Sequence, residues 1–342
     1  MSAPRIIVAV PTPLVGEFFS TESWSRLEAA AAALAVADGA DPEGALVRVD
    51  ALAEVADPSQ AQVYIPAWGA AAVDAETLAR MPRLRLLAHS GASVHFLVTD
   101  ALWDAGIRVS QTGAAMARPV AEVSLTFTLS LLHRVHRLDH AMHAGAGWEA
   151  AVQPGAQHEI GGCPITVVGA SRTGRSYLSL LRALGAEPLL VDPTIDAAEA
   201  ASLGARLVDL DEGMSAARIV ALHAPSLPQT HHMIGARELR LMRDGAGLVN
   251  TARSWLVDEE ALLAEVTTGR IDAAIDVFDQ EPLPLDHPFR SLDNVLLTPH
   301  RAAGTVEGRL HQGRIVADEV EAYLADRPLQ HTVTREQIAT MA

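Results

Sequence analysis

The chain has 342 residues, of which 49% are hydrophobic and 20% are charged, and its formal net charge at pH 7 is -16. This length suggests two domains, because a single hydrophobic core rarely grows beyond about 250–300 residues. The negative charge argues against partners such as nucleic acid or an anionic membrane, since both would repel the surface.

The N-terminal segment predicts a short buried strand rather than a secretory signal, because Pro11 interrupts its apolar stretch "IIVAV". The longest apolar run covers residues 29–37, far fewer than the roughly 20 residues that a bilayer-spanning helix needs. The single cysteine, Cys163, directly precedes an apolar run, so we expect an inert core thiol. These features favour a cytoplasmic protein that does not bind membranes.

Along the chain, short apolar runs alternate with segments of helical spacing. Runs of this kind predict strands that are covered on both faces, and strand–helix alternation predicts parallel sheets. The predicted strands, in chain order, are "RIIVAV", "ALVRVD", "AQVYIP", "LRLLAHS", "IRVSQT", "PITVVG", "EPLLVD", "RLVDL", "RIVALHA", "GLVNTA", "DAAIDVF" and "NVLLTPH".

Two predicted helices define the domain organisation. One long helix over residues 118–145 is expected to carry the chain from one domain to the other, and a last helix over about 305–327 is expected to return it. The fold class is therefore α/β, with a doubly wound parallel-sheet (Rossmann) domain, residues 113–303, inserted into a smaller flavodoxin-like α/β domain, residues 1–112 plus 304–342. Ligands bind beyond the carboxyl ends of parallel strands, so we expect the chemistry there.

The segment "VVGASRTGRS" resembles the G-x-G-x-x-G turn of dinucleotide-binding domains, with Gly169, Ser171 and Gly174 at the three glycine positions. Serine is small enough for the middle position, and its hydroxyl can donate to a phosphate. The next predicted strand ends in Asp192, where an acidic residue would bind the ribose hydroxyls. Because no arginine follows Asp192 to receive a 2′-phosphate, we expect NAD rather than NADP. The alternative is an ordinary strand–turn–helix.

Three later strand ends carry polar residues. Arg253 and Asp276 each follow a predicted buried strand, Glu281 lies in a proline-flanked loop, and His300 ends another strand. Each has an ordinary alternative as a surface cation, a solvated carboxylate or a core histidine. Together they supply an acid–base group, carboxylates and a cation for an anionic substrate.

At this point the chain resembles the D-isomer-specific 2-hydroxyacid dehydrogenases over nearly its whole length. Several segments in the same order carry the resemblance. They are "ARPVAE" at 117, the glycine turn at 169, "LHAPSLPQT" at 222, "LVNTAR" at 248, "DVFDQEPL" at 276 and "LLTPHRAAG" at 296.

The resemblance implies a role for each matching residue. The catalytic trio would be Arg253, Glu281 and His300, and Asp276 would hold the nicotinamide carboxamide. The other implied NAD-binding residues are Gly169, Ser171, Arg172, Thr173, Gly174, Asp192, Pro225, Thr230, Thr251 and Ala252. The residues implied to bind substrate are Ser90, Gly91, Ala92, Ser93 and Arg253. The family also implies a homodimer formed through the NAD domain.

The expected reaction is reduction of a 2-keto acid to a D-2-hydroxy acid. Protonated His300 would donate to the keto oxygen, Glu281 would favour and orient the imidazolium, and Arg253 would bind the carboxylate. Ser171 and Trp255 depart from the family pattern, and Trp255 puts the substrate in doubt. Because the chain ends soon after its last predicted helix, we expect no additional regulatory domain.

Three alternatives remain open at the level of sequence. Formate oxidation is disfavoured because the corresponding enzymes pair histidine with glutamine rather than with a residue such as Glu281. Phosphite oxidation and a non-catalytic, NAD(H)-sensing regulator of the same fold both stay possible. We predict no metal site, because His136 and His140 lack further ligands. With His133 and His143 we expect them on a polar helix face or dimer contact, and His231 and His232 are treated likewise.

Overall fold

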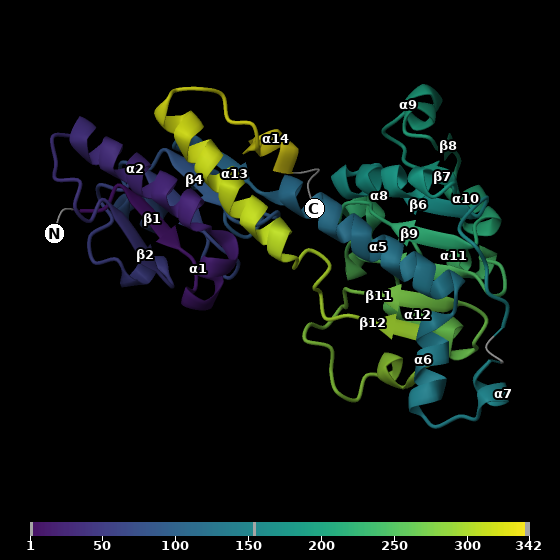
Figure 1. Ribbon diagram of the computed structural model, residues 1–342. Coiled ribbons are helices and arrows are strands. Elements are labelled where there is room, and N and C mark those ends of the chain that lie inside the picture. The colour runs from purple at the N-terminus through teal and green to yellow at the C-terminus, as the bar shows by residue number, and fades with distance from the viewer. Residues whose placement is uncertain (1–2, 153–154, 339–342) are drawn as a thin grey trace. The chain divides into compact units, whose positions relative to one another are not determined.

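A computed structural model describes residues 3–152 and 155–338 of the chain. The chain forms two compact units, each with its own sheet (Figure 1). One unit contains the residues up to Met116 together with those from Gly304 onward, and the other contains Ala117–Ala303. The predicted α/β class with parallel sheets is confirmed.

The first unit contains a six-stranded sheet in the order β13-β5-β4-β3-β1-β2, in which β13 pairs antiparallel with β5 and the other pairs are parallel. Its five parallel strands follow the flavodoxin-like order 2-1-3-4-5. The strands are β1 (Ile6–Ala9), β2 (Leu46–Val49), β3 (Val63–Pro66), β4 (Leu86–His89), β5 (Arg108–Gln111) and β13 (Thr332–Val333). The helices are α1 (Thr12–Phe18), α2 (Thr21–Ala37), η1 (Leu52–Glu54), α3 (Ala75–Arg80), α4 (Asp100–Asp104), η2 (Gly113–Met116), α13 (Val306–Leu324) and α14 (Arg335–Ile338).

The second unit contains a seven-stranded parallel sheet in the order β12-β11-β10-β9-β6-β7-β8, which is the doubly wound arrangement. The strands are β6 (Pro164–Val168), β7 (Glu187–Val191), β8 (Arg206–Leu207), β9 (Ile219–Leu222), β10 (Gly247–Asn250), β11 (Asp272–Ile275) and β12 (Val295–Leu297). The helices are α5 (Ala117–Leu132), α6 (Val135–His143), α7 (Trp148–Ala151), α8 (Arg172–Ala183), α9 (Ala197–Ser202), α10 (Leu210–Ala216), η3 (Pro228–Thr230), α11 (Ala236–Leu241), η4 (Ser254–Leu256), α12 (Glu259–Thr267) and η5 (Pro288–Ser291).

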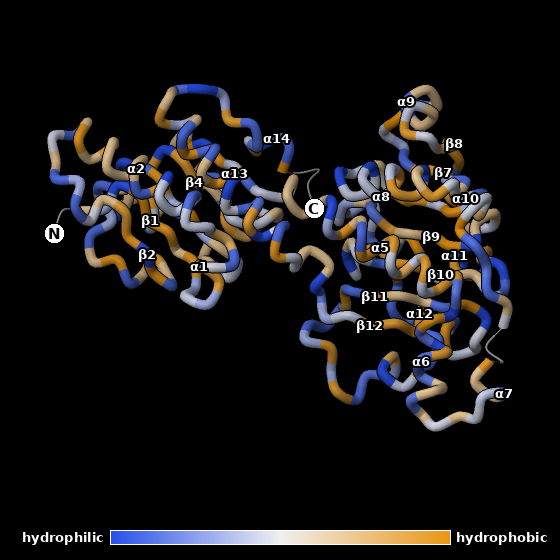
Figure 2. The backbone as a smooth tube through the Cα atoms, viewed as in Figure 1, coloured by the Kyte–Doolittle hydropathy of each residue, from blue (hydrophilic) through white to orange (hydrophobic). Residues whose placement is uncertain are grey.

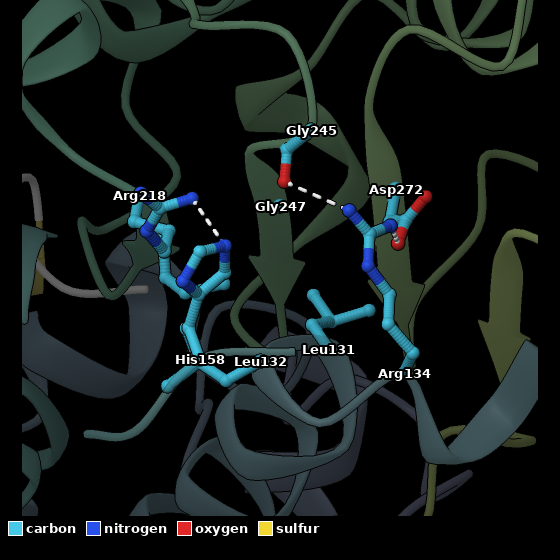
Figure 3. A pocket seen from close by; sticks show the side chains of 9 residues that line it. Leu131, Leu132, Arg134, His158, Arg218, Gly245, Gly247 and Asp272 are labelled. Carbon is cyan, nitrogen blue, oxygen red and sulfur yellow. Dashed lines mark hydrogen bonds and ion pairs between the residues drawn. The ribbon is translucent and has the colours of Figure 1, made fainter. Parts of the chain in front are cut away.

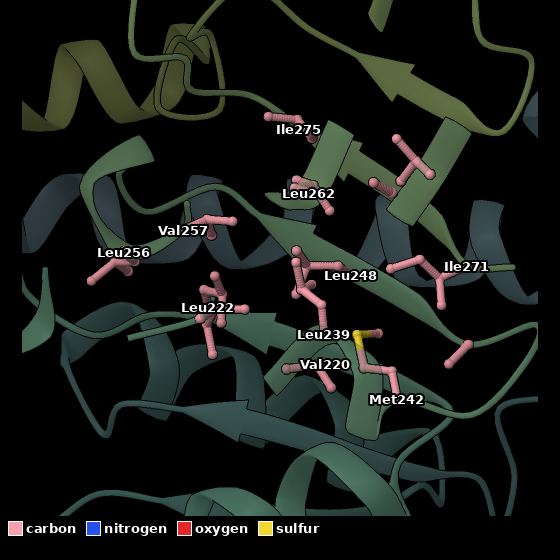
Figure 4. Packing of buried hydrophobic residues seen from close by; sticks show 14 of the residues in the cluster. Val220, Leu222, Leu239, Met242, Leu248, Leu256, Val257, Leu262, Ile271 and Ile275 are labelled. Atoms are coloured by element: carbon pink, nitrogen blue, oxygen red, sulfur yellow. The ribbon is translucent and has the colours of Figure 1, made fainter. Parts of the chain in front are cut away.

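Both faces of the second sheet are buried, which explains why its strands are continuous apolar runs. Along β9, Val220 and Leu222 belong to one core cluster, which includes residues of α10, α11 and α12. Ile219 and Ala221 belong to a second cluster on the other face, with residues of α5 and α8. Figure 4 shows the first cluster, and Figure 2 shows that the strands are mainly orange and hence hydrophobic.

The sequence predicted strands β1 to β12, and the structure confirms each of them. The two-residue strand β13 was not predicted. Helices α2, with 17 residues, and α13, with 19 residues, are among the longest. Within residues 3–152 and 155–338, no helix combines the length and apolarity needed to cross a membrane.

The prediction of one long helix over residues 118–145 is wrong. The structure has two helices, α5 and α6, separated at Arg134, whose φ of 56° is left-handed. A left-handed residue costs about 1–2 kcal/mol, so this conformation requires compensation. The Arg134 side chain is buried and forms an ion pair with Asp272 at the start of β11. This ion pair stabilises the break between the two helices. Helix α5 also begins inside the second unit, at its first residue, Ala117.

Candidate active site

The carboxyl ends of three neighbouring strands carry the predicted catalytic residues. Strands β10, β11 and β12 pair in parallel, so they end at the same edge of the sheet. Arg253 follows β10, Asp276 follows β11 and His300 follows β12. Glu281 lies in the loop after Asp276, so all four residues belong to the second unit.

His300 and Glu281 form a hydrogen-bonded pair. Nδ1 of His300 lies 2.7 Å from Oε2 of Glu281. The other carboxylate oxygen of Glu281 accepts a hydrogen bond from the backbone N–H of Phe278 at 3.0 Å, which fixes the carboxylate. The His300 side chain is 49% exposed. Because Nδ1 is engaged with the carboxylate, Nε2 is the nitrogen left to exchange a proton with a ligand.

Asp276 holds the loop that presents His300. The backbone N–H of His300 donates to the carbonyl of Asp276 at 2.8 Å, and His300 adopts a left-handed φ of 51°. The fully buried Asp276 carboxylate accepts hydrogen bonds from the hydroxyl of Thr298 and from the backbone N–H groups of Arg301 and Ala302. A carboxylate has about four acceptor positions, so Asp276 has room for about one more donor.

Arg253 is a half-buried cation on a short, well-fixed loop. The Asn250 side chain donates to the carbonyl of Arg253 at 2.9 Å and accepts from the N–H of Ala252 at 3.1 Å. Burial lowers the pKa of Arg253, and the negative charge of Glu281 opposes that effect. One guanidinium nitrogen donates to the Ala252 carbonyl at 2.6 Å. In the described part of the chain, no carboxylate forms an ion pair with this guanidinium, so most of its donors are available to a ligand.

The glycine turn after β6 has the geometry of a phosphate-binding turn. Gly169 has a φ of 103°, and a Cβ at this position would lie 2.5 Å from the backbone nitrogen of Ala224. A Cβ on Gly174 would lie 2.1 Å from the carbonyl oxygen of Gly169. Ser171 has an ordinary φ of −60° and caps α8 by accepting from the N–H of Gly174. Serine therefore fits the middle position, and its O–H remains able to donate.

Arg172 and Thr173 form the first turn of α8, where backbone N–H groups lack intrahelical partners and attract anions. Asp192 follows β7 and connects to the glycine turn, because its Oδ2 accepts from the N–H of Ala170 at 2.6 Å. Burial disfavours the charged form of Asp192, but hydrogen bonds from Thr194 and Ala170 outweigh it and lower the pKa of the carboxyl. A tight turn, a helix N-terminus and a half-exposed carboxylate together fit a dinucleotide.

The remaining predicted cofactor residues follow β9 and β10 at the same edge of the sheet. The Thr230 hydroxyl donates to the carbonyl of Pro225 at 2.6 Å and closes the turn after β9. The hydroxyl of the buried Thr251 lies 2.7 Å from that of Ser124 on α5. Ala252 is held by Asn250, as described above. All the predicted cofactor residues thus lie along one edge.

The predicted substrate loop, residues 90–93, follows β4 in the first unit. The backbone N–H and the hydroxyl of Ser90 both donate to the carbonyl of Pro66 at 3.0 Å, which anchors the loop. Ala92 and Ser93 are partly exposed, and among the described residues their N–H groups have no acceptor. Two neighbouring N–H groups of this kind are suited to binding an anion.

The histidines of α6, together with His133 just before it, do not form one polar face. His136 is buried, with Nε2 3.7 Å from the carboxylate of Asp272, whereas His140 and His143 are exposed and His133 is half-buried. Burial lowers the pKa of His136, and the charge of Asp272 opposes the change. Over the residues that the structure describes, no cluster of three or more His, Cys, Asp or Glu has metal-binding geometry.

Two further groups from the sequence prediction remain. His231 and His232 stack with ring centroids 3.9 Å apart, and His231 lies 4.0 Å from the half-exposed Trp255. The Trp255 indole donates to the carbonyl of Leu227 at 2.9 Å, so its position is fixed. The Cys163 thiol is buried, and burial raises its pKa, as expected for an unreactive core thiol.

Three further residues shape this edge and were not among the predicted ones. Asn250 orders the Arg253 loop and Thr298 donates to Asp276. His223 packs beneath the glycine turn with its ring 5.0 Å from that of Tyr177, and burial lowers its pKa to about 3. The available signal was a polar residue directly after an apolar run, in "LHAPS", "LVNTA" and "LLTPH".

A small cavity lies at the opposite, amino end of the same sheet, beside the first residues of β9, β10 and β11 (Figure 3). Arg134 points toward Asp272 there, and an Arg218 nitrogen lies 2.9 Å from Nε2 of His158. The cavity has a volume of about 10 Å³, room for about one water molecule. It is too small for an organic substrate.

Comparison with known proteins gives consistent matches. A model of the family described as D-isomer specific 2-hydroxyacid dehydrogenase, NAD binding domain, matches residues 125–302. D-3-phosphoglycerate dehydrogenase of Methanocaldococcus jannaschii is 31% identical over 268 residues, or 78% of this chain, which spans 50% of that protein's length. Glyoxylate reductase of Aeropyrum pernix is 30% identical over 273 residues, covering 78% of this chain and 81% of that protein.

Among solved structures, a phosphoglycerate oxidoreductase from Rhizobium etli has a TM-score of 0.73 and 27% identity, covering 97% of this chain and 99% of that chain. The fold, the glycine turn and the family match to the NAD-binding unit therefore agree, and a nicotinamide cofactor follows from them. On this evidence the chain belongs to the D-isomer specific 2-hydroxyacid dehydrogenase family.

Proposed function

We propose that the protein reduces a 2-keto acid to a D-2-hydroxy acid with NADH. The observation that carries the proposal is the pair of His300 and Glu281, 2.7 Å apart, at the strand edge that also bears Arg253. An acid–base group, a carboxylate that orients it and a free cation are what this reaction requires.

His300 would be the proton donor. In the imidazolium, Nδ1–H donates to Glu281 and Nε2–H is left for the keto oxygen of the substrate. After transfer, His300 is neutral and takes up a proton from solvent through its half-exposed side chain. In the oxidative direction the same nitrogen would accept the proton.

Arg253 would bind the substrate carboxylate and polarise the keto oxygen. Its planar guanidinium can donate two parallel hydrogen bonds to a carboxylate, a geometry that lysine lacks. A half-buried cation without an ion-pair partner among the described residues is stabilised by an anionic ligand. The free N–H groups of Ala92 and Ser93 would contribute further donors to a carboxylate.

The cofactor would be held by the edge formed by β6, β7, β9 and β10. Ser171, Arg172 and Thr173 would bind the pyrophosphate at the N-terminus of α8, and Asp192 would accept hydrogen bonds from the ribose. Bound NADH supplies the hydride that reduces C2 of the substrate. Because Asp192 is negatively charged, it would repel a 2′-phosphate, so we expect preference for NADH over NADPH and erosion of that preference in Asp192→Ala.

The proposal assigns one role to each part of the chain. Residues 113–303 would bind NAD, and residues 1–112 with 304–342 would bind the substrate. Four apolar side chains on α6, on α7 or directly after α7 support a homodimer through the NAD domain, since each is more than 50% exposed. They are Val135, Met142, Trp148 and Val152. Light scattering would test this, with dissociation expected for Trp148→Asp but not for Leu285→Asp, a change at another exposed residue of the same unit. We also propose a cytoplasmic location, a compartment in which a free thiol such as that of Cys163 stays reduced.

The direct test is NADH consumption by the pure protein with glyoxylate, hydroxypyruvate, pyruvate and an aromatic 2-keto acid. Turnover of at least one of them, and formation of the D-hydroxy acid, is expected. NADH binding without turnover of any of them would contradict the proposal and would favour an NAD(H)-sensing regulator. Formate and phosphite with NAD⁺ are included, because oxidation of either would identify a different reaction on the same fold.

A further inference from the structure

Two aromatic side chains stand at one edge of the first unit's sheet. Trp68 follows β3 and Phe96 follows β4, and these strands are parallel neighbours. Their carboxyl ends therefore meet at the same edge, where parallel sheets bind ligands. Trp68 is 38% exposed and Phe96 is 39% exposed, so each presents part of its ring to solvent. Covering a ring of this size is favourable, so both rings offer apolar binding surface at this edge.

Both aromatic residues border the loop of residues 90–93. A Cβ on Gly91 would lie 2.6 Å from Nε1 of Trp68 and 2.5 Å from Nε2 of His89. The His89 ring in turn meets Phe96 edge to face, with centroids 5.6 Å apart. Trp68 therefore lies against the loop backbone directly. Phe96 contacts His89, which in turn lies against the loop at Gly91. A ligand held by the loop's N–H groups would have aromatic surface next to it.

Trp68 is held in place rather than free to move over the surface. Its ring packs on Phe18 at a centroid distance of 5.3 Å. The Arg309 guanidinium of α13 lies 5.4 Å from the centroid of Phe18 and 5.8 Å from that of Trp68. This cation–aromatic stack adds to the packing and fixes the ring. The exposed surface of Trp68 is therefore preformed.

Two ionisable groups that contact these rings, Arg309 and His89, are not free cations. The Arg309 guanidinium lies 2.8 Å from the carboxylate of Glu17 and is compensated by it. His89 is fully buried, and its Nδ1 must donate to the carbonyl of Pro66 at 3.0 Å, because a carbonyl only accepts. Burial lowers the pKa of His89 to about 4, so the ring is neutral at pH 7. A phosphate group, which requires uncompensated cations, has no partner among these residues.

We infer that Trp68 and Phe96 bind the side chain of the substrate, and that the preferred substrate is a 2-keto acid with a bulky apolar substituent, aryl or branched alkyl. The inference rests on the proposed function, because it requires the substrate carboxylate to bind at residues 90–93. The carboxylate meets the free N–H groups, and the apolar substituent covers the exposed aromatic surface. Small and phosphorylated 2-keto acids leave that surface exposed and are poorer substrates.

The experiment compares kcat/KM with NADH for phenylpyruvate, 2-ketoisocaproate, glyoxylate and phosphohydroxypyruvate. The first two are expected to exceed the last two by at least about tenfold, a usual discrimination for an apolar pocket. Trp68→Ala and Phe96→Ala should each lower kcat/KM for phenylpyruvate by about tenfold while changing the value for glyoxylate by less than about threefold. Trp68→Phe keeps an aromatic face and should retain most of the preference.

Trp103→Ala is the matched control, since Trp103 packs against another core cluster of the same unit. It should leave the ratio of phenylpyruvate to glyoxylate unchanged, and melting temperatures will identify a variant that fails to fold. An active enzyme that prefers glyoxylate or phosphohydroxypyruvate overturns the inference and leaves the proposed function standing. Equal losses for all substrates in Trp68→Ala and Phe96→Ala overturn it as well. Turnover of no keto acid by a protein that binds NADH overturns the proposed function and this inference together.

Discussion

Two aspartates, Asp272 and Asp276, lie at opposite ends of strand β11 and have different partners. Asp272 begins the strand and forms ion pairs with Arg134 and Arg137. Asp276 follows the strand and accepts from a hydroxyl and two backbone N–H groups. Both carboxylates are buried. At the amino end of the sheet, the aspartate charge is therefore balanced by arginines. At the carboxyl end, the aspartate charge orders a loop through hydrogen bonds.

The cations at the two ends differ in the same way. At the amino end, Arg134 and Arg137 share one carboxylate, and the adjacent cavity holds about one water molecule. At the carboxyl end, Arg253 forms no ion pair with a described residue, and His300 is half-exposed beside Glu281. A cluster of charged side chains is therefore not by itself a site. The carboxyl end differs because it has hydrogen-bond donors that are unpaired and that a ligand can reach.

The largest expected effect is the loss of the proton donor. His300→Ala should lower kcat/KM for keto-acid reduction by about 10²–10⁴-fold, the usual contribution of a general acid. NADH affinity should stay nearly the same, because His300 acts on the substrate oxygen. His158→Ala, a change at the amino end, is the control and should retain normal turnover. Steady-state kinetics and NADH titration measure both, and normal turnover of His300→Ala would exclude this histidine as the acid.

At the amino end the expected effect is on stability rather than catalysis. Asp272→Ala leaves the buried Arg134 and the partly buried Arg137 without their shared partner, and breaking a buried ion pair usually costs about 3–5 kcal/mol of unfolding free energy. Where the variant is still folded, its kcat/KM should lie within about threefold of wild type. This is a smaller change than a tenfold one, which corresponds to about 1.36 kcal/mol. Denaturant unfolding and kinetics at low temperature provide the two measurements. A large fall in kcat/KM of the folded variant would show that the two ends are coupled.

The glycine turn allows a comparison at a single position. Ser171→Leu places a bulky side chain where the pyrophosphate approaches, so NADH affinity should fall more than about tenfold, or 1.4 kcal/mol. Ser171→Gly should change it less than tenfold, because the residue has an ordinary φ and glycine is a tolerated helix cap. Fluorescence titration with NADH measures both variants. Unchanged affinity in Ser171→Leu would mean that phosphate binds elsewhere.

The sequence predicted the strands and the fold class because both depend on local patterns. Continuous apolar runs indicated strands buried on both faces, and their alternation with helices indicated parallel sheets. The break at Arg134 was not predictable in this way, because its left-handed conformation is stabilised by Asp272, a residue distant in sequence. The same limit explains why His136 was expected on a polar face although it is buried.

Residues of the candidate site could be identified in the sequence because they follow predicted strands. Their contacts could not be predicted from the sequence. His300, Glu281 and Arg253 stand out as polar residues after apolar runs. That Asp276 accepts from Thr298, Arg301 and Ala302 follows only from the backbone path of that loop. The two aromatic residues in the first unit were missed for the same reason. Trp68 and Phe96 are separated in sequence and border the same loop only after β3 and β4 pair.

The smallest expected effect is that of Glu281→Gln. Glu281 lies 2.7 Å from Nδ1 of His300 and orients the ring. Glutamine keeps the shape and the hydrogen-bond acceptor, so kcat/KM for reduction should fall by less than about tenfold, or 1.36 kcal/mol. Steady-state kinetics measure the effect, and a loss as large as that of His300→Ala would show that the acceptor alone is not enough.

Glu281→Ala is the matched comparison, because alanine removes the hydrogen-bond acceptor that glutamine keeps. Nδ1 of His300 then loses its partner at 2.7 Å, and the ring is no longer held in one orientation. We expect kcat/KM to fall further than in Glu281→Gln, while NADH affinity stays nearly the same because Glu281 acts through His300. Equal losses in the two variants would show that the hydrogen bond to His300 is not what Glu281 contributes.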